Sequence, residues 1–406
     1  MSWIVENVVN LNNWRHGVPK IKANLKKDDN PLRIGVLSAA AINGVAILDP
    51  VQTHPGSIIS AIAARDISRA QAQIDACKFG KECKAYGSYA ELLGDPNIEA
   101  VYIPLPNGLH AEWTIKALEA GKHVLVEKPI AANAEEVRKI GETAARTNKF
   151  AVEAFHWRFH PAAHAVKDMV ESGKYGNVTS VFAQMKIPRG GVGKTDIRYD
   201  YALGGGSSMD LAYVFSACCY FASSDIENCT FGVQSAVPRL SSTDKRIDEA
   251  MESKFTIEQA GKPSVNCHIQ TDLAIPPFLG LIPKLWMLSP SVCVELEKAK
   301  IEFTNFALPT IGHSIFITEK DVEGRLTGKK RTETCFTGGH WEAIGVSGEK
   351  WWTTYRYQLE SFVRQVRAKE SGQVYGGPNV ALSDGVKMME LIDSVYDKAG
   401  LPKRGI

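Results

Sequence analysis

The chain has 406 residues, of which 44% are hydrophobic, so it is long enough to form two domains with separate cores. Its 47 basic and 45 acidic residues nearly balance, and no long run of one sign occurs. This balance argues against nucleic acid or an anionic membrane surface as the partner and favours a small molecule. The 8 cysteines form no CxxC pair and have no histidine at ligand spacing, so we expect a reducing compartment and no metal site.

The N-terminal stretch, MSWIVENVVNLNNWRHGVPK, lacks the basic start and continuous apolar segment of a secretory signal. No apolar run reaches the roughly 18 residues that a membrane span requires. We therefore expect a cytoplasmic protein with no membrane partner. Residues 1–30 precede the first clear strand and are predicted to form an N-terminal arm, which lies on the surface or packs on a second subunit.

Short apolar strands alternate with helical stretches from residue 31 to residue 156. The strands read LRIGVL, SIISAIAA, AVYIPL, HVLVEK and FAVEAF. Apolar strands separated by helices are typical of βαβ units in a parallel sheet that is buried on both faces. Residues 31–156 are thus predicted to form a doubly wound α/β domain of the Rossmann type.

The pattern changes after residue 175, where longer strands such as NVTSVFAQMKI, ESKFTIEQAG and SVNCHIQTDLA follow one another with few helices between them. Strands that succeed one another indicate a mostly antiparallel sheet with one covered face. Residues 157–406 are predicted to form this second, α+β domain, and two helices close the chain.

The turn after the first strand is the expected place for a dinucleotide phosphate, because ligands bind beyond the carboxyl ends of parallel strands. A GxGxxG run usually stands there, since its glycines let the backbone approach a pyrophosphate. Here Ser38, Ala40 and Asn43 take the three glycine positions. The run therefore indicates either a modified phosphate loop or an ordinary tight turn.

The end of the second strand carries Arg65, and Asp66 stands one residue too late to accept hydrogen bonds from an adenosine ribose. An acidic residue at this corner is typical of NAD sites, whereas an arginine is typical of NADP sites. The sequence favours NADP over NAD; the alternative is a helix start with solvated arginines.

The next two strand ends carry further polar groups, namely Pro106, Asn107, His110, Glu127 and Lys128. Pro129 follows Lys128, and an X-Pro bond at a strand end fixes an unusual turn that can hold the preceding side chain toward the crevice. A lysine there can hydrogen-bond a nicotinamide ribose and a substrate oxygen together. The alternative is a surface lysine paired with Glu127.

Residues 187–206 contain several glycines together with Arg198, which suits a polar loop over a substrate crevice as well as an ordinary long connection. His156 and Arg158 follow the last parallel strand and are predicted to line the same crevice and contact substrate. The apolar stretch IPPFLGLIPKLWMLSP, residues 275–290, is predicted to form a subunit interface or a wall of the pocket.

Three stretches carry a family resemblance: the run from AELLGDPNIEA to LVEKPIAANAEEV, then VEAFHWRFHP, then ALGGGSSMDLAY. In this order they resemble the Gfo/Idh/MocA oxidoreductase family, especially its dimeric dihydrodiol dehydrogenases and NADP-dependent D-xylose dehydrogenases. The resemblance implies that Lys128 contacts the nicotinamide and that Asn107 and His110 lie beside the cofactor. It also implies that the second domain binds substrate and forms a homodimer, or a higher homo-oligomer, through an open-faced sheet.

The family motif that reads Asp210-Leu-Ala-Tyr-Val in this chain departs from the family pattern. The family places its acid–base His or Tyr four residues after the Asp, where this chain has Val214. Tyr213 stands one residue early, and one residue of α-helix is a rotation of about 100°. Tyr213 therefore faces the substrate only if the local helix is shifted; otherwise it is a core or interface tyrosine. Asp210 is expected to be a polar contact in the site.

Taken together, these features predict an NADP-dependent oxidoreductase that moves hydride between nicotinamide and a C–OH or C=O carbon of a sugar, a cyclic diol or a related small molecule. Lys128, Tyr213 and Asp210 are its predicted catalytic residues. Two alternatives stay open, a dinucleotide-binding regulator without catalysis and a non-redox enzyme that retains the cofactor.

Overall fold

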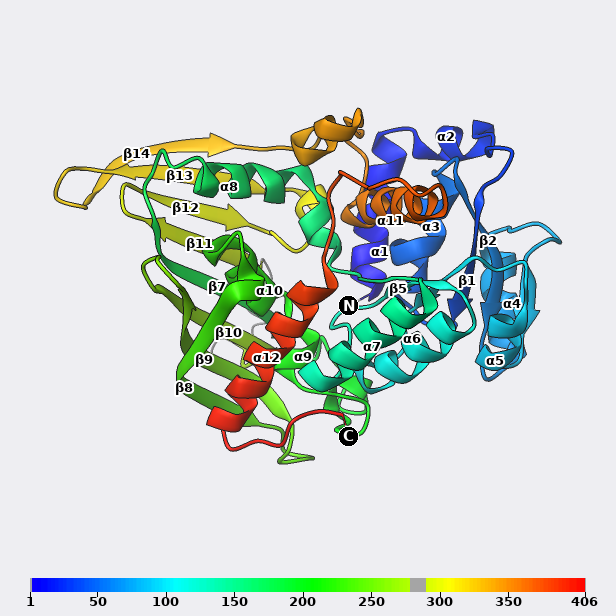
Figure 1. Ribbon diagram of the computed structural model, residues 1–406, viewed down its shortest axis with the longest axis horizontal. Helices are drawn as coiled ribbons and strands as arrows, with labels where there is room; N and C mark the ends of the chain where they lie inside the picture. The colour runs from blue at the N-terminus through cyan, green and yellow to red at the C-terminus, as the bar shows by residue number, and fades with distance from the viewer. Residues whose placement is uncertain (1, 278–289, 406) are drawn as a thin grey trace.

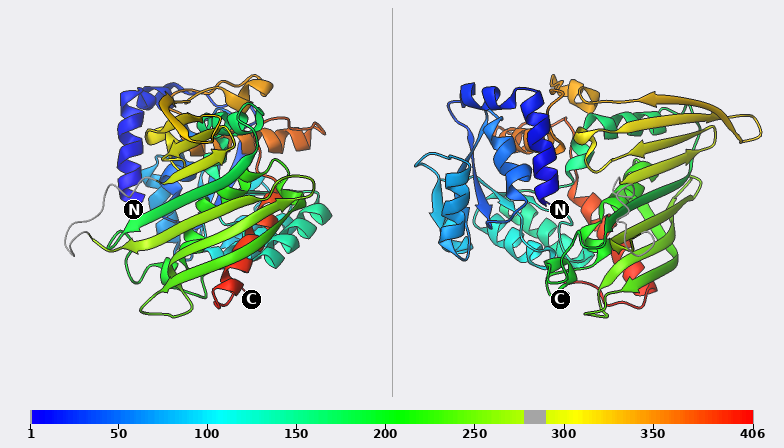
Figure 2. Two further views of the ribbon diagram at one scale, coloured as in Figure 1. Left: turned by 90° about the vertical axis from the view of Figure 1, so that its left-hand side faces the viewer. Right: turned by 180° about the vertical axis from the view of Figure 1, so that it is seen from behind.

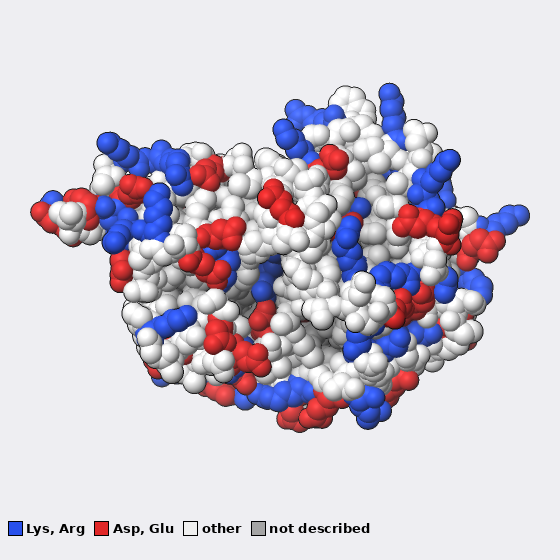
Figure 3. Space-filling model, turned by 45° about the horizontal axis from the view of Figure 1, so that its top comes forward, with Lys and Arg blue, Asp and Glu red and all other residues white. Residues whose placement is uncertain are grey.

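The computed structural model describes residues 2–277 and 290–405 and contains two β-sheets that lie next to each other (Figure 1). The first sheet and its helices occupy one side of the molecule, and the second sheet occupies the other side. On the face seen in Figure 3, basic and acidic side chains are interspersed, in agreement with the near-zero net charge. Among the described residues, no helix combines the length and the apolar character needed to cross a bilayer.

The first sheet has six strands in the order β3-β2-β1-β4-β5-β6, and every recorded pairing in it is parallel. Its strands are β1 (Leu32–Leu37), β2 (Ser57–Ala63), β3 (Lys84–Tyr86), β4 (Ala100–Ile103), β5 (His123–Val126) and β6 (Ala151–Glu153). Its helices are α3 (Asp49–Gln52), α4 (Ile67–Ala76), α5 (Tyr89–Gly94), α6 (His110–Glu119) and α7 (Ala134–Thr147), with a π-helical turn η1 (Gly44–Leu48) before α3. This is the doubly wound Rossmann order, and its strand order reverses between β1 and β4, the point where such sheets bind ligands.

The second sheet has eight strands in the order β14-β13-β12-β11-β7-β10-β9-β8, and only the β10–β7 pairing in it is parallel. The strands are β7 (Val178–Pro188), β8 (Cys229–Leu240), β9 (Asp248–Gln259), β10 (Val265–Ile275), β11 (Ser291–Leu296), β12 (Ala299–Thr304), β13 (Ser314–Lys320) and β14 (Leu326–Glu333). One face is covered by α8 (Pro161–Glu171), α10 (Tyr213–Ala222) and α12 (Leu382–Lys398), whereas no helix of the described residues covers the other face (Figure 2). The predicted fold class, a Rossmann sheet with a second, mostly antiparallel open-faced sheet, is confirmed.

Residues 1–30 were predicted to form an arm, and their described part forms two helices, α1 (Ser2–Arg15) and α2 (Val18–Asn24). Both helices pack on this chain itself, because Asn13 donates a hydrogen bond to Asp49 of α3 (3.2 Å) and Lys22 forms an ion pair with the same carboxylate. Val18 is buried in this contact region, whereas Trp14 remains 70% exposed.

Helix α11 (Thr354–Glu370) lies in the second half of the chain but packs against the first sheet's side of the molecule. Arg367 pairs with Glu99 at 2.9 Å, and Glu360 lies 3.2 Å from His54. A boundary at residue 156 therefore does not assign every element to the sheet on which it packs. Helix α11 begins about 200 residues after this boundary and still packs on the elements of the first sheet.

Candidate active site

Lys128 lies at the carboxyl end of β5, next to the point where the two sheets meet. The strand before it is buried throughout, and Glu127 is buried and accepts a hydrogen bond from Tyr102 (2.7 Å). Burial raises the pKa of Glu127, although Lys128 and the Tyr102 hydroxyl oppose this shift. The Lys128–Pro129 peptide is cis. The lysine side chain is only 12% exposed, so its ammonium group is held inside the junction rather than in bulk solvent.

Asp210 receives this ammonium group. Lys128 Nζ donates to the backbone oxygen of Asp210 at 2.7 Å and lies 3.5 Å from Oδ1 of the same residue. Arg198, from the loop between β7 and the short helix α9 (Ser207–Asp210), pairs with Asp210 Oδ2 at 2.7 Å. Burial acts to raise the pKa of the Asp210 carboxyl. Arg198 and Lys128 together lower this pKa by more than burial raises it, so the pKa lies below its ordinary value. The carboxylate stays charged and fixes both cations.

Tyr213 reaches the same cluster because the helix is interrupted. Helix α9 ends at Asp210, Leu211 leaves the helical conformation (φ −98°, ψ 30°), and α10 begins at Tyr213. Lys128 Nζ consequently lies 5.3 Å from the centroid of the Tyr213 ring. Val214, at the position where the family pattern has its acid–base residue, is fully buried. The interruption supplies the local helix shift that Tyr213 requires in order to face Lys128.

The loop after β4 ties the strand ends together. His110 is fully buried, and its two ring nitrogens lie 2.7 Å from the carbonyl oxygens of Pro129 and Leu105. Burial lowers its pKa to about 4. Asn107 follows Pro106 and donates to the backbone oxygen of Gly204 at 3.1 Å. His110 thus braces the Lys128–Pro129 turn, and Asn107 joins the first domain to the loop that carries Arg198.

The loop at the end of β1 stands where a phosphate loop is expected and has Ser38, Ala40 and Asn43 in place of the three glycines. Ser38 has φ +130°, a backbone conformation that normally favours glycine. Each carbonyl of the turn is held by a side chain: Asn43 donates to Ser38 O (2.7 Å), and two residues of α4, Arg69 and Gln73, donate to Ala39 O and Ala40 O. The carbonyl oxygens of residues 38–40 are therefore engaged by side chains, and the side chains of residues 39–41 are single methyl groups.

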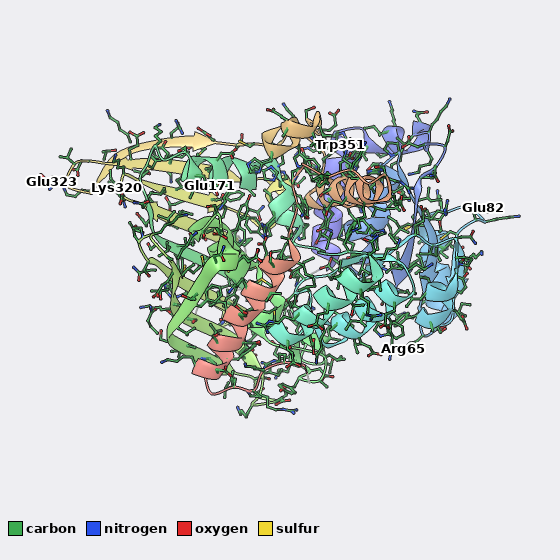
Figure 4. The ribbon with its side chains drawn as sticks, in the orientation of Figure 1. Arg65, Glu82, Glu171, Lys320, Glu323 and Trp351 are labelled. Atoms are coloured by element: carbon green, nitrogen blue, oxygen red, sulfur yellow. The ribbon has the colours of Figure 1, made fainter. Side chains whose placement is uncertain are left out.

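Arg65 follows β2 and is exposed at the lower rim of the first domain (Figure 4). Asp66 caps α4 instead of pointing to a ribose, since its Oδ1 accepts the backbone N–H of Ser68 at 3.0 Å. Arg65 therefore remains available at the corner where a 2′-phosphate would lie.

His156 and Arg158 were both predicted to line the crevice, but the structure separates them. His156 is buried behind Tyr213, with Nε2 at 2.9 Å from the tyrosine hydroxyl. Arg158 pairs instead with Asp384 at 2.5 Å and lies over the Tyr220 ring at 4.6 Å. It lines a separate cavity of about 280 Å³, because the carboxylate at the start of α12 draws its guanidinium away from Lys128.

Residues from distant parts of the chain complete the surroundings of this cluster. Thr354 of α11 holds His156 at 2.8 Å, and Asp248 with Arg404 anchors the Gly204–Ser208 turn before Asp210. Sequence reasoning did not find them, since no local motif distinguishes a lone Thr, Asp or Arg. The predicted apolar segment 275–290 lies largely outside the described residues. Within the described part of the chain, no group of His, Cys, Asp or Glu is arranged to hold a metal ion.

A Rossmann sheet with a lysine at the end of β5, facing an aspartate and a tyrosine from the second domain, defines a dinucleotide-dependent oxidoreductase class. Residues 32–155 match the family described as "Oxidoreductase family, NAD-binding Rossmann fold", Gfo/Idh/MocA. The chain is 30% identical over 295 residues to the trans-1,2-dihydrobenzene-1,2-diol dehydrogenase of Macaca fuscata fuscata, covering 69% of this chain and 81% of that protein. The chain belongs to the Gfo/Idh/MocA oxidoreductase family, and the prediction of a dehydrogenase or reductase is confirmed.

Other relatives match over different lengths. The D-xylose 1-dehydrogenase (NADP(+)) 2 of Haloferax volcanii is 29% identical over 380 residues, which cover 91% of this chain and 97% of that protein. The uncharacterized oxidoreductase ORF334 of Rhizobium meliloti is 41% identical, but the match spans only 44% of this chain and 52% of that protein. Among solved structures, the 3-ketoreductase KijD10 of Actinomadura kijaniata, in complex with NADP and TDP-benzene, has a TM-score of 0.71 at 23% identity and covers 93% of this chain and 99% of that one.

Proposed function

We propose that the chain is an NADP-dependent oxidoreductase that interconverts a C–OH and a C=O group of a sugar, a cyclic diol or a related polyhydroxylated molecule. The observation that carries the proposal is the Lys128–Asp210 contact, which sets an ammonium group beside Tyr213 at the carboxyl end of β5. Two of the relatives that match over most of their length are named as dehydrogenases of such compounds, one of D-xylose and one of a dihydrodiol.

The residues of the first domain fit a dinucleotide. The braced Ser38–Asn43 turn would receive the pyrophosphate, and Arg65 would receive the 2′-phosphate that distinguishes NADP from NAD. When bound, NADP supplies or accepts the hydride. The protein positions the substrate against the cofactor and supplies the groups that give or take the proton.

Each polar residue of the cluster has a distinct task in this proposal. Lys128 and Tyr213 hold the substrate oxygen, and they give it a proton on reduction or take one from it on oxidation. Asp210 keeps Lys128 in place through the 2.7 Å contact to its backbone oxygen and pairs with Arg198. The Arg198 side chain is 34% exposed, so its guanidinium can also donate a hydrogen bond to a hydroxyl group of the substrate from the loop between β7 and α9.

The cofactor assignment is tested by fluorescence titration of the protein with NADPH and NADH. NADPH is expected to bind at least about tenfold more tightly, a difference of about 1.4 kcal/mol. Arg65→Ala is expected to remove this preference while leaving the affinity for NADH unchanged, so NADH serves as the control within the same variant. Failure of the protein to bind either nucleotide would overturn the oxidoreductase assignment.

The catalytic assignment is tested with Lys128→Ala in a screen of aldoses, cyclic diols and their carbonyl forms. The variant is expected to lose at least about 100-fold in kcat, the usual contribution of a positioned acid–base group. Lys116→Ala, an exposed lysine of α6, is the matched control and is expected to keep full activity. Near-normal turnover of Lys128→Ala would remove Lys128 from the chemistry.

The two alternatives give different results in the same assays. A regulator would bind NADPH without turning over any compound in the screen and would capture a protein partner. An enzyme that retains its cofactor in a closed cycle would convert substrate without net oxidation of added NADPH, and deuterium from labelled NADPH would not accumulate in the product.

A further inference from the structure

The Tyr213 hydroxyl is the first member of a row of buried side chains that leads away from Lys128. His156 Nε2 lies 2.9 Å from the Tyr213 hydroxyl, and His156 Nδ1 lies 2.8 Å from the Thr354 hydroxyl. The exposed fractions of these residues are 8% for Tyr213, 1% for His156 and 1% for Thr354. The row joins three segments, the start of α10, the turn after β6 and the start of α11, so it exists only in the folded chain.

The imidazole of His156 is held in one orientation. The Tyr355 ring lies against it with centroids 4.0 Å apart and planes 34° from parallel, and Phe155 packs edge-on against Tyr213. Burial, and to a lesser degree Lys128, lowers the pKa of His156 to about 3. The ring is therefore neutral at ordinary pH and carries a single N–H, which sits on one nitrogen or the other.

Thr354 is the hydrogen-bond partner of Nδ1, so its hydroxyl can select which nitrogen carries that hydrogen. Thr354 stands in the first turn of α11, after the cap residue Thr353, and its own backbone N–H donates to Thr310 at 3.2 Å. Within the described residues, the contact to His156 is the one hydrogen bond recorded for its hydroxyl. A buried hydroxyl that donates to Nδ1 leaves the hydrogen on Nε2, because the partner of one ring nitrogen sets the tautomer. Nε2–H then donates to the Tyr213 oxygen, and the Tyr213 O–H is left for a partner other than His156.

We propose that Thr354 and His156 are positioning residues, which set the tautomer of the imidazole and thereby aim the Tyr213 O–H at the oxygen of the substrate. This inference rests on the proposed function. On reduction, the Tyr213 O–H bond breaks and a new O–H bond forms on the former carbonyl oxygen of the substrate. NADPH, when bound, would supply the hydride to the carbon of that group. The phenolate is held by Nε2–H until a proton taken up from solvent restores the Tyr213 hydroxyl.

The first test compares Thr354→Val, which keeps the shape of the side chain but removes the hydroxyl, with Thr354→Ser, which keeps the hydroxyl. Thr354→Val is expected to lower kcat at least about tenfold with little change in KM, and Thr354→Ser is expected to restore most of the turnover. The same Thr354→Val change is then made in Tyr213→Phe, where no hydroxyl remains to be aimed and no further loss of kcat is expected. An equal loss in both backgrounds, or no loss in either, would overturn the proposal.

The second test needs no substrate and so separates this inference from the proposed function. In protein labelled with ¹⁵N-histidine, long-range ¹H–¹⁵N spectra report which ring nitrogen carries the hydrogen, and His156→Gln identifies the His156 signals by their disappearance. The wild-type protein is expected to show a neutral ring with the hydrogen on Nε2, and Thr354→Val is expected to change that pattern. Hydrogen on Nδ1 in the wild type would overturn the positioning role and leave the oxidoreductase assignment standing.

Discussion

Ser38 holds the turn at the end of β1 in a backbone conformation that an L-residue rarely adopts, with φ +130°. Such a conformation costs of order 1–3 kcal/mol and persists where surrounding contacts impose it. Here those contacts are side-chain hydrogen bonds, since Asn43, Arg69 and Gln73 donate to three successive carbonyl groups of the turn. One side chain from the turn and two from α4 thus hold Ser38 in a backbone conformation that glycine would adopt without strain.

Ser38→Gly is accordingly expected to raise the free energy of unfolding by about 1 kcal/mol, because glycine adopts this φ without strain. Ala41→Gly in the same turn is the control. Since φ of residue 41 is not positive, that change only adds chain entropy to the unfolded state and should lower stability by a few tenths to about 1 kcal/mol. Urea denaturation measures both, and a destabilised Ser38→Gly would show that the turn carries no strain.

At the scale of elements, a buried ion pair anchors the segment that leads into α9. Arg404 Nη2 lies 2.9 Å from Asp248 of β9, with both side chains 0% exposed, and Arg404 Nε donates to Gly205 O at 2.7 Å. Asp248 also accepts from Ser207 Oγ and the Ser208 N–H. The C-terminal segment therefore positions the turn that presents Asp210 to Lys128.

Arg404→Ala is expected to lower the free energy of unfolding by about 3 kcal/mol, because it leaves the Asp248 carboxylate buried without its cation. Lys403→Ala, whose side chain is 49% exposed, is the neighbouring control and should change stability by less than about 0.5 kcal/mol. The double variant Arg404→Met with Asp248→Asn removes both charges and should recover part of the loss. If Arg404→Ala unfolds at the wild-type urea concentration, the anchor has no energetic role.

At the scale of the whole molecule, buried histidines make stability depend on pH. Burial lowers the pKa of His54 and His110 to about 4 and that of His123 to about 3. The same cause lowers the pKa of four more, namely His156, His160, His164 and His313. Burial acts oppositely on three carboxyl groups, since it raises the pKa of Glu127, that of Glu153 to about 8 and that of Asp393 to about 6.

The sign of the pH effect follows from these shifts. Below the ordinary histidine pKa of 6.5 the unfolded chain binds protons that the folded histidines exclude, so their stabilisation is present above pH 6.5 and is lost as the pH falls toward 4. The three carboxyl groups with raised pKa values oppose this trend, but the seven buried histidines outnumber them. The free energy of unfolding is expected to fall by more than about 1.4 kcal/mol per pH unit over this window, the slope for one proton. A flat profile from urea denaturation between about pH 6.5 and 4.5 would contradict the burial of these rings.

The uncovered face of the eight-stranded sheet is the predicted homodimer surface (Figure 2). Phe182 lies on the central strand β7, with its ring 5.0 Å from that of His268 on β10. Phe182→Glu is expected to convert a dimer to a monomer, because it places unpaired charge at the centre of an interface. Val322→Glu, at a fully exposed hairpin tip, is the control and should leave the mass unchanged. Size-exclusion chromatography with light scattering measures the molar mass of the wild type and of both variants. A monomeric wild type would show that the prediction of a homodimer is wrong.

The local pattern of the sequence predicted the Rossmann sheet, the open-faced second sheet and the residues at the strand ends. It could do so because a strand buried on both faces is apolar throughout, whereas a strand buried on one face alternates apolar and polar residues. Lys128, Asp210 and Arg198 were found in this way or by resemblance, and the structure brings them within contact of one another. The break between α9 and α10, which turns Tyr213 toward Lys128, has no corresponding hydrophobic pattern in the sequence.

Only the tertiary structure determined which residues support the cluster of Lys128, Asp210 and Tyr213. The contact of His156 with Thr354 joins residues 198 positions apart, and that of Arg404 with Asp248 joins residues 156 positions apart. The direction of Arg158 was decided in the same way, by an aspartate 226 positions later. Hydrophobic periodicity determines which face of an element is buried, but the partner of a lone polar side chain is set by how the elements pack, and that information is not local in the sequence.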